Sequence, residues 1–217
     1  MLICNSCHGG CCRNFGVGLT GYDILNISKI LNLDPISFVQ VLPVDKDIEL
    51  QSKYSALFKF TDYNINYFYR FCLRMDKSML VSETIKCMFL LECFANPLVL
   101  SEDKIIARCG IYTCRPLICR TFPSKLDPTE KMGIVFNPIV ENTENKIYNL
   151  CPRTLTNDDL DNSSDEILKS LIMRKFEVDY FKNLAEYWNK NPGTISEFLI
   201  FMEKVYKKRV LVENVTE

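Results

Sequence analysis

In the last third of the chain, apolar residues recur every three or four positions, the spacing of an α-helix with one buried face. This stripe runs over 164–190 and consists of Ile167, Leu168, Leu171, Ile172, Phe176, Phe181, Leu184 and Trp188. Residues 191–193 (Asn-Pro-Gly) break the pattern, and Thr194 with Glu197 forms a capping box that begins a second helix. The inward positions of that helix are Ile195, Phe198, Leu199, Met202, Val205 and Tyr206. The pattern predicts an antiparallel helical hairpin, and the basic residues near its end, Lys204, Lys207, Lys208 and Arg209, are interpreted as a solvated face.

The first half of the chain has shorter elements. Thr20 with Asp23 resembles a capping box and predicts a helix that begins at residue 21. Asp34 followed by Pro35 predicts a second, short helix ending near Leu42. Residues 54–60 and 66–75 alternate imperfectly and predict the two strands of a hairpin, with loop over 45–53 before it. Further short strands are expected over 87–91, 131–136 and 146–150, with loop over 92–108. The expected fold class is α+β: a small cysteine-rich metal-binding domain over 1–155, with short helices and a small antiparallel sheet, capped by the helical hairpin at 156–217.

Composition excludes several classes of protein. The 217 residues carry a formal net charge of −1 and are 47% hydrophobic, which is too apolar for a disordered chain. The near-neutral charge offers no electrostatic footprint for nucleic acid. The amino terminus lacks the basic and apolar regions of a secretory leader, and no apolar stretch approaches the ~20 residues of a membrane helix. We therefore expect a soluble cytoplasmic protein that binds neither nucleic acid nor membrane.

Eleven cysteines and a single histidine are the unusual feature of the composition. In a reducing cytosol, clustered cysteines are typical of metal binding or catalysis rather than disulfides. Four of them form the run Cys4-x2-Cys7-x3-Cys11-Cys12. Thiolates at this spacing in a turn can converge on one metal ion, although the adjacent Cys11 and Cys12 require a bent loop or two metal centres. No cysteine follows Cys151, so the thiol chemistry is confined to the first 151 residues.

A second cluster lies at 109–123, with the sequence Cys-Gly-Ile-Tyr-Thr-Cys-Arg-Pro-Leu-Ile-Cys-Arg-Thr-Phe-Pro. Together with the amino-terminal run, the helix opening on Leu-Thr-x2-Asp and the later Cys-x-Phe-Leu, this segment resembles the YkgJ-type cysteine-cluster proteins. These proteins are described as zinc- or iron-chelating domains and include the flagellin lysine N-methylases. The resemblance covers roughly residues 4–152. Its matching non-cysteine positions are Ile111, Tyr112, Arg115, Pro116, Arg120 and Pro123.

The resemblance implies eight metal ligands: Cys4, Cys7, Cys11, Cys12, Cys87, Cys109, Cys119 and Cys151. Eight thiols exceed what one tetrahedral ion can use, so they indicate two four-sulfur centres or one polynuclear cluster. With a single histidine in the chain, all-sulfur coordination selects either an iron–sulfur cluster or zinc, and the number of thiols favours iron–sulfur. Cys72, Cys93 and Cys114 fall outside the family pattern and are interpreted as packed thiols.

Two arginines, Arg115 and Arg120, flank Cys119 and are candidates for cofactor binding. A guanidinium group is a planar fork for carboxylate or phosphate, so the pair either clamps an anionic cofactor or substrate or offsets the negative charge of the thiolates. Gly16, Gly18 and Gly21 fit a dinucleotide fingerprint, but no strand precedes them. We interpret these glycines as the exit from a metal loop into a helix.

Three functions are compatible with these observations. The first is a metal-binding protein whose centre is structural or redox-active and acts with a protein partner. The second, implied by the family resemblance alone, is a protein lysine N-methylase that uses S-adenosylmethionine on a protein substrate. The third is a metal carrier or sensor. The sequence leaves open whether the protein is an enzyme.

Overall fold

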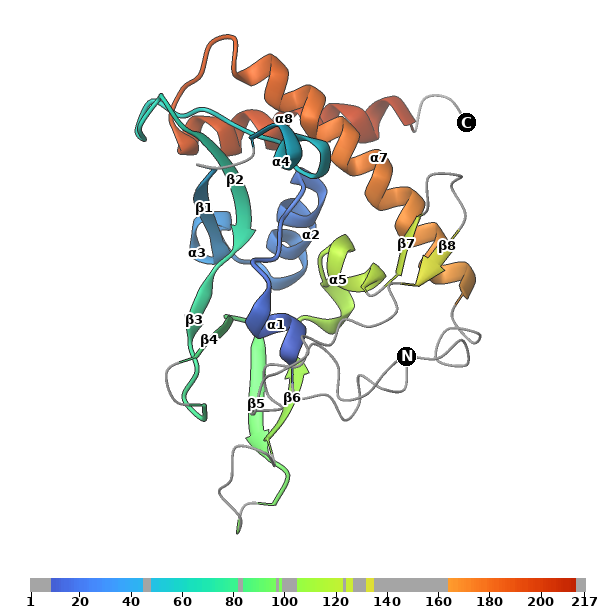
Figure 1. Ribbon diagram of the computed structural model, residues 1–217. Helices are drawn as coiled ribbons and strands as arrows, with labels where there is room; N and C mark the ends of the chain where they lie inside the picture. Colours follow the sequence, from blue (N-terminus) through green and yellow to red (C-terminus); the bar gives the residue numbers. More distant parts are fainter. Residues whose placement is uncertain are drawn as a thin grey trace. The chain divides into compact units, whose positions relative to one another are not determined.

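The structure, a computed structural model, describes residues 9–44, 48–81, 84–96, 98, 105–122, 124–126, 132–134 and 164–213. Contacts divide the chain into two compact units, each built from two stretches of sequence. We call the first, Met1–Val17 with Leu73–Met173, the cysteine unit, and the second, Gly18–Cys72 with Arg174–Glu217, the aromatic unit. The domain boundary predicted at residue 155 lies outside the described residues. The predicted α+β class is confirmed, with helices and short two-stranded sheets along the described chain (Figure 1).

The described strands β3 to β8 of the cysteine unit form three two-stranded antiparallel sheets. They pair β3 (Met75–Lys77) with β4 (Ile85–Cys87), β5 (Leu90–Phe94) with β6 (Ile105–Cys109), and β7 (Ser124–Leu126) with β8 (Met132–Ile134). The helices of this unit are α1 (Gly10–Asn14), the 3-10 turn η3 (Tyr112–Cys114), α5 (Leu117–Thr121) and the beginning of α7 (Ser164–Trp188).

The strand predicted over 87–91 is split in two, because a turn at Met88 and Phe89 separates β4 from β5. The prediction of loop over 92–108 is wrong at both ends: β5 covers its beginning and β6 its end. The two strands pair antiparallel, from Leu90 opposite Cys109 to Phe94 opposite Ile105. The amide of Gly110 donates to the carbonyl of Phe89 at 2.8 Å and closes this end of the hairpin. Cys87 ends β4 directly before the turn at Met88 and Phe89, and Cys109 ends β6 opposite Leu90, the first residue after that turn.

The aromatic unit combines helices with one two-stranded sheet. Its elements are α2 (Gly21–Leu31), α3 (Pro35–Phe38), β1 (Val39–Val44), α4 (Ile48–Tyr54), β2 (Phe68–Leu73, of which Leu73 belongs to the cysteine unit), α7 from Arg174, and α8 (Ile195–Glu213). Both predicted capping boxes are present: Thr20 exchanges hydrogen bonds with Asp23, and Thr194 does so with Glu197.

Three sequence predictions fail in this unit. Helix α3 is a single turn, and the valine-rich segment that follows it extends as β1, since β-branched side chains favour strands. The segment 45–53, predicted as loop, contains most of α4, and its residues 45–47 lie outside the described chain. The strand predicted over 54–60 is reduced to one bridge between Phe58 and Tyr69. The side chain of Asn189 replaces the missing strand: it donates to the carbonyl of Leu57 and accepts from the amide of Lys59, both at 2.8 Å.

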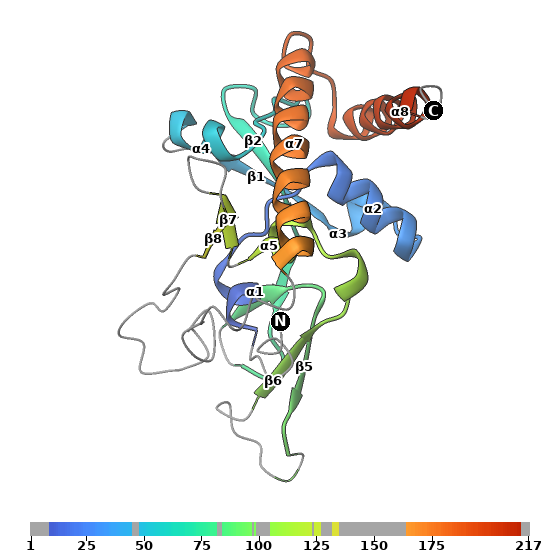
Figure 2. The same ribbon diagram turned by 90° about the vertical axis from the view of Figure 1, so that its right-hand side faces the viewer.

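Aromatic rings fill the core of this unit. Phe58 lies 4.6 Å from Phe198 and 4.9 Å from Phe181, measured between ring centroids, and Phe71 lies 5.3 Å from Phe198. The indole nitrogen of Trp188 donates to a backbone carbonyl, that of Lys59, at 2.9 Å. The predicted pair of carboxy-terminal helices is confirmed, and Figures 1 and 2 show α8 leaving at a steep angle to α7. No helix in the described part of the chain is both long and apolar enough to cross a membrane.

Packing in the aromatic unit leaves no room for a side chain at Gly21. A Cβ there would lie 2.6 Å from Cε2 and 2.8 Å from the hydroxyl of Tyr206. We expect Gly21→Ala to lower the free energy of unfolding by about 1–3 kcal/mol through overpacking, even though alanine is the better helix former. Gly18→Ala is the matched control, since its Cβ would meet nothing within 4 Å. Urea unfolding of both variants checks this, and equal stabilities would contradict it.

Candidate metal centre

Five of the eight predicted ligands lie in the described chain, all in the cysteine unit. Cys11 and Cys12 are on α1, Cys87 ends β4, Cys109 ends β6, and Cys119 is on α5. Cys4, Cys7 and Cys151 lie outside the described residues. The five thiols thus come from four separate segments of the chain.

Gly9 allows α1 to approach the β5–β6 hairpin closely. Its φ of 78° is in the left-handed region that glycine adopts readily. A Cβ at this position would lie 2.9 Å from the Leu90 side chain and 3.0 Å from that of Ala107. At the other end of α1, the ring of Phe15 meets that of Phe122 edge to face at 5.8 Å, just after α5. These contacts fix α1 between the segments that carry Cys109 and Cys119.

The five thiols are close enough to act on one another electrostatically. The Sγ atoms of Cys11 and Cys12 are 4.0 Å apart. The hydrogen bond to Cys11 raises the pKa of the Cys12 thiol, and burial and the charges of Cys11, Cys119 and Cys87 raise it further. Burial, together with the charges of Cys109 and Cys11, raises the pKa of Cys87 to about 11. The arrangement therefore resists the accumulation of negative charge unless a cation is present.

Arg115 supplies positive charge to this cluster. The hydrogen bond from Cys12 lowers the pKa of the Cys11 thiol, and the guanidinium of Arg115 lowers it further. Burial raises the pKa of the Cys109 thiol, and the charge of Arg115 opposes this increase. The guanidinium lies 4.0 Å over the ring of Tyr112. Its Nε is buried without a hydrogen-bond partner among the described residues. This geometry favours the interpretation of Arg115 as a residue that offsets thiolate charge.

Arg120 has a different position. Its Nε donates to the carbonyl of Arg115 at 2.8 Å, and one Nη donates to the carbonyl of Thr113 at 3.3 Å. The side chain therefore ties the turn before α5 together, and these two bonds engage the guanidinium for which the sequence left open either an anionic cofactor or the charge of the thiolates.

The three cysteines outside the family pattern differ from one another. Cys72 and Cys114 are buried, as expected for packed thiols, whereas Cys93 is exposed on β5 with its Sγ 3.8 Å from the carbonyl of Ile106. The charge of Cys114 contributes to the raised pKa of Cys109, so Cys114 also lies near the cluster. Among the described residues, no three cysteine, histidine, aspartate or glutamate side chains form a group that could hold a metal ion.

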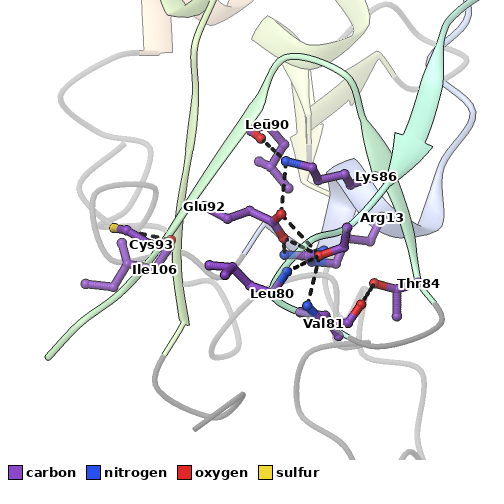
Figure 3. Close-up of polar contacts among 10 residues, drawn as sticks. Arg13, Leu80, Val81, Thr84, Lys86, Leu90, Glu92, Cys93 and Ile106 are labelled. Atoms are coloured by element: carbon purple, nitrogen blue, oxygen red, sulfur yellow. Dashed lines mark hydrogen bonds and ion pairs between the residues drawn. The ribbon is translucent and has the colours of Figure 1, made fainter. Parts of the chain in front are cut away.

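A buried ion network next to the thiols was not predicted from the sequence (Figure 3). Glu92 on β5 pairs with Arg13, which follows Cys12 on α1, and with Lys86 at 2.9 Å; the Ser78 hydroxyl donates to both of its carboxylate oxygens, at 2.9 and 3.1 Å. The side chains of Arg13 and Glu92 are 1% and 3% exposed. Nε and Nη1 of Arg13 have no hydrogen-bond partner among the described residues.

Comparisons with protein-family models, with curated proteins and with solved structures find no match to this chain. The resemblance to the YkgJ-type family therefore stays a prediction.

Proposed function

We propose that the cysteine unit binds a metal centre through thiolates, and that this centre is structural or redox-active. The observation that carries the proposal is that Cys11, Cys12, Cys87, Cys109 and Cys119, drawn from four segments, influence one another's pKa, with the Sγ atoms of Cys11 and Cys12 4.0 Å apart. A cation that accepts several thiolates removes the repulsion that this arrangement otherwise creates.

The donor set agrees with such a centre. Two thiolates bound to one tetrahedral zinc at ~2.3 Å are separated by roughly 3.8 Å, and the Sγ atoms of Cys11 and Cys12 are 4.0 Å apart. Because the described residues form no complete ligand group, we propose that Cys4, Cys7 and Cys151 complete the coordination. Arg115 would offset the excess negative charge of the thiolates.

The two candidate centres supply different chemistry. Zinc would stabilise the fold without redox activity, and an iron–sulfur cluster would add one-electron transfer. In either case the binding energy contributes to folding, because the ligands belong to segments far apart in the sequence. As in the sequence analysis, the number of thiols favours iron–sulfur.

Anaerobic purification followed by metal and sulfide analysis tests the proposal. We expect a brown protein with broad visible absorption, iron bound in stoichiometric amounts and about as much acid-labile sulfide as iron. A colourless protein that carries zinc keeps the metal site and contradicts the iron–sulfur assignment. A folded full-length protein that takes up neither metal, even after anaerobic reconstitution, contradicts the whole proposal.

The other functions suggested by the sequence are separable by experiment. A carrier or sensor exchanges its metal readily with a chelator, whereas a structural centre retains it until the chain unfolds. The methylase hypothesis requires that the metal-loaded protein bind S-adenosylmethionine, which calorimetric titration measures directly. No heat of binding would remove that hypothesis and leave the metal site unaffected.

A further inference from the structure

In the aromatic unit, three rings surround one guanidinium group. The guanidinium carbon of Arg209, on α8, lies 4.8 Å from the ring centroid of Phe176, 4.7 Å from that of Tyr180 and 5.8 Å from that of Tyr206. All three distances are within the ~6 Å over which a cation is attracted to a ring face. From the sequence, Arg209 is interpreted as part of a solvated basic face, but in the structure its side chain is only 23% exposed.

A buried carboxylate completes this site. The side chain of Glu177 is 2% exposed, and its Oε1 forms an ion pair with Nη1 of Arg209 at 2.7 Å. Its Oε2 accepts from the hydroxyl of Tyr206 at 3.1 Å. Burial, together with the charge of Glu177, raises the pKa of Tyr206, so this hydroxyl stays protonated and donates. An ionised carboxylate at this depth requires a cationic partner.

Contacts that do not involve Arg209 hold two of the three rings, those of Tyr180 and Tyr206, in place. Tyr180 and Tyr206 meet edge to face with centroids 5.2 Å apart and an interplanar angle of 84°. Tyr206 is also packed against Gly21 on α2, where there is no space for even a Cβ. On the outer side Phe176 is 56% exposed, so the site is accessible from solvent. Tyr180, Tyr206 and the Glu177 carboxylate bonded to Tyr206 thus form a preorganised cation site, and Phe176 adds an exposed third ring.

We propose that Phe176, Glu177, Tyr180 and Tyr206 form a binding site for guanidinium groups, that Arg209 is its built-in occupant, and that an arginine side chain of a partner polypeptide competes with it. The planar guanidinium suits this site because it can stack on the rings while it donates to the carboxylate. Arg209 lies four residues before the end of α8, close to the helix terminus. This site is independent of the metal centre proposed for the cysteine unit.

Arg209→Ala in the full-length protein tests the proposal by removing the built-in occupant. The probe is N-acetyl-argininamide, with N-acetyl-lysinamide as the matched cation, and binding is followed by calorimetry and by the shift in melting temperature. We expect the variant to bind the arginine probe in the millimolar range, roughly tenfold more tightly than the lysine probe and roughly tenfold more tightly than the wild type does. Lys207→Ala, which removes an exposed pair with Glu203, is the control and behaves as the wild type.

A second variant keeps the test decisive where Arg209→Ala does not fold. Arg209→Lys retains the positive charge but loses the planar fork, and it is expected to bind the arginine probe more tightly than the wild type does. Adding Glu177→Gln to either variant abolishes the binding. The proposal is overturned by a folded variant that binds neither probe, or that binds the arginine and lysine probes equally.

Discussion

Cys12→Ser is expected to abolish stoichiometric metal loading of the cysteine unit. The pKa of the Cys12 thiol responds to three neighbours in the cluster, Cys11, Cys119 and Cys87. Serine keeps the size of the side chain but replaces a soft thiolate with a hydroxyl that remains protonated and ligates zinc or iron poorly. We expect a decrease in metal affinity of at least about tenfold, together with destabilisation of this unit, because the binding energy of a structural metal is folding energy.

Metal analysis of anaerobically purified protein, combined with limited proteolysis, measures both effects. Cys93→Ser is the matched control: Cys93 is exposed and lies outside the predicted ligand pattern, so its replacement leaves the metal content unchanged. Full metal occupancy in Cys12→Ser would exclude Cys12 as a ligand. Equal losses in the two variants would indicate that general thiol chemistry, rather than a defined centre, governs metal uptake.

The features predicted correctly from the sequence are local ones. Both capping boxes join residues three positions apart, Thr20 with Asp23 and Thr194 with Glu197, so their hydrogen bonds depend only on the geometry of a helix start. The long helical stripe likewise predicted α7 to within two residues of its end. The grouping of cysteines from distant segments into one ligand set is implied only by the family resemblance, since no periodicity relates Cys11 to Cys109, and it stays a prediction.

Features that depend on distant parts of the chain were missed. Asn189 replaces a strand beside residues 57–59 across more than 120 positions of sequence, and nothing in a single amide side chain indicates this partner. Arg13 and Glu92 are separated by 79 positions. The helical stripe included Phe176, which is exposed, and passed over Glu177, which is buried. Hydrophobic patterns assign carboxylates to the surface, whereas the contacts of Glu177 with Arg209 and Tyr206 make its burial possible.

Glu92→Gln should strongly destabilise the cysteine unit. The carboxylate is the acceptor for Arg13, Lys86 and Ser78. Glutamine fits the space but has no charge, so the Arg13 guanidinium, with a side chain 1% exposed, is left buried without a counterion. Removing one member of a buried ion pair typically lowers the free energy of unfolding by about 3–5 kcal/mol. Glu203→Gln removes an exposed pair with Lys207 and is expected to lower it by less than about 1 kcal/mol.

The pH dependence of this difference gives an independent test. Burial alone would raise the pKa of the Glu92 carboxyl, but hydrogen bonds from Lys86, Arg13 and Ser78 outweigh it and hold the pKa below its ordinary value. A carboxyl whose pKa is lower in the folded state stabilises the protein fully above the unfolded-state pKa of about 4.3, and this stabilisation is lost as the pH falls through the folded-state value. The stability gap between the wild type and Glu92→Gln should therefore be constant from neutral pH to about pH 5 and decrease in more acidic solution. A gap that persists unchanged in acid would show that the glutamine disturbs packing rather than charge.

Because Arg13 directly follows Cys12 on α1, Glu92→Gln also tests whether the ion network supports the proposed metal centre. If the network fixes α1 against β5, Glu92→Gln lowers metal affinity as well as stability, and Glu203→Gln lowers neither. A stable Glu92→Gln protein with undiminished metal affinity would place the positioning of Cys11 and Cys12 in other contacts of α1, namely Gly9 against Leu90 and Phe15 against Phe122.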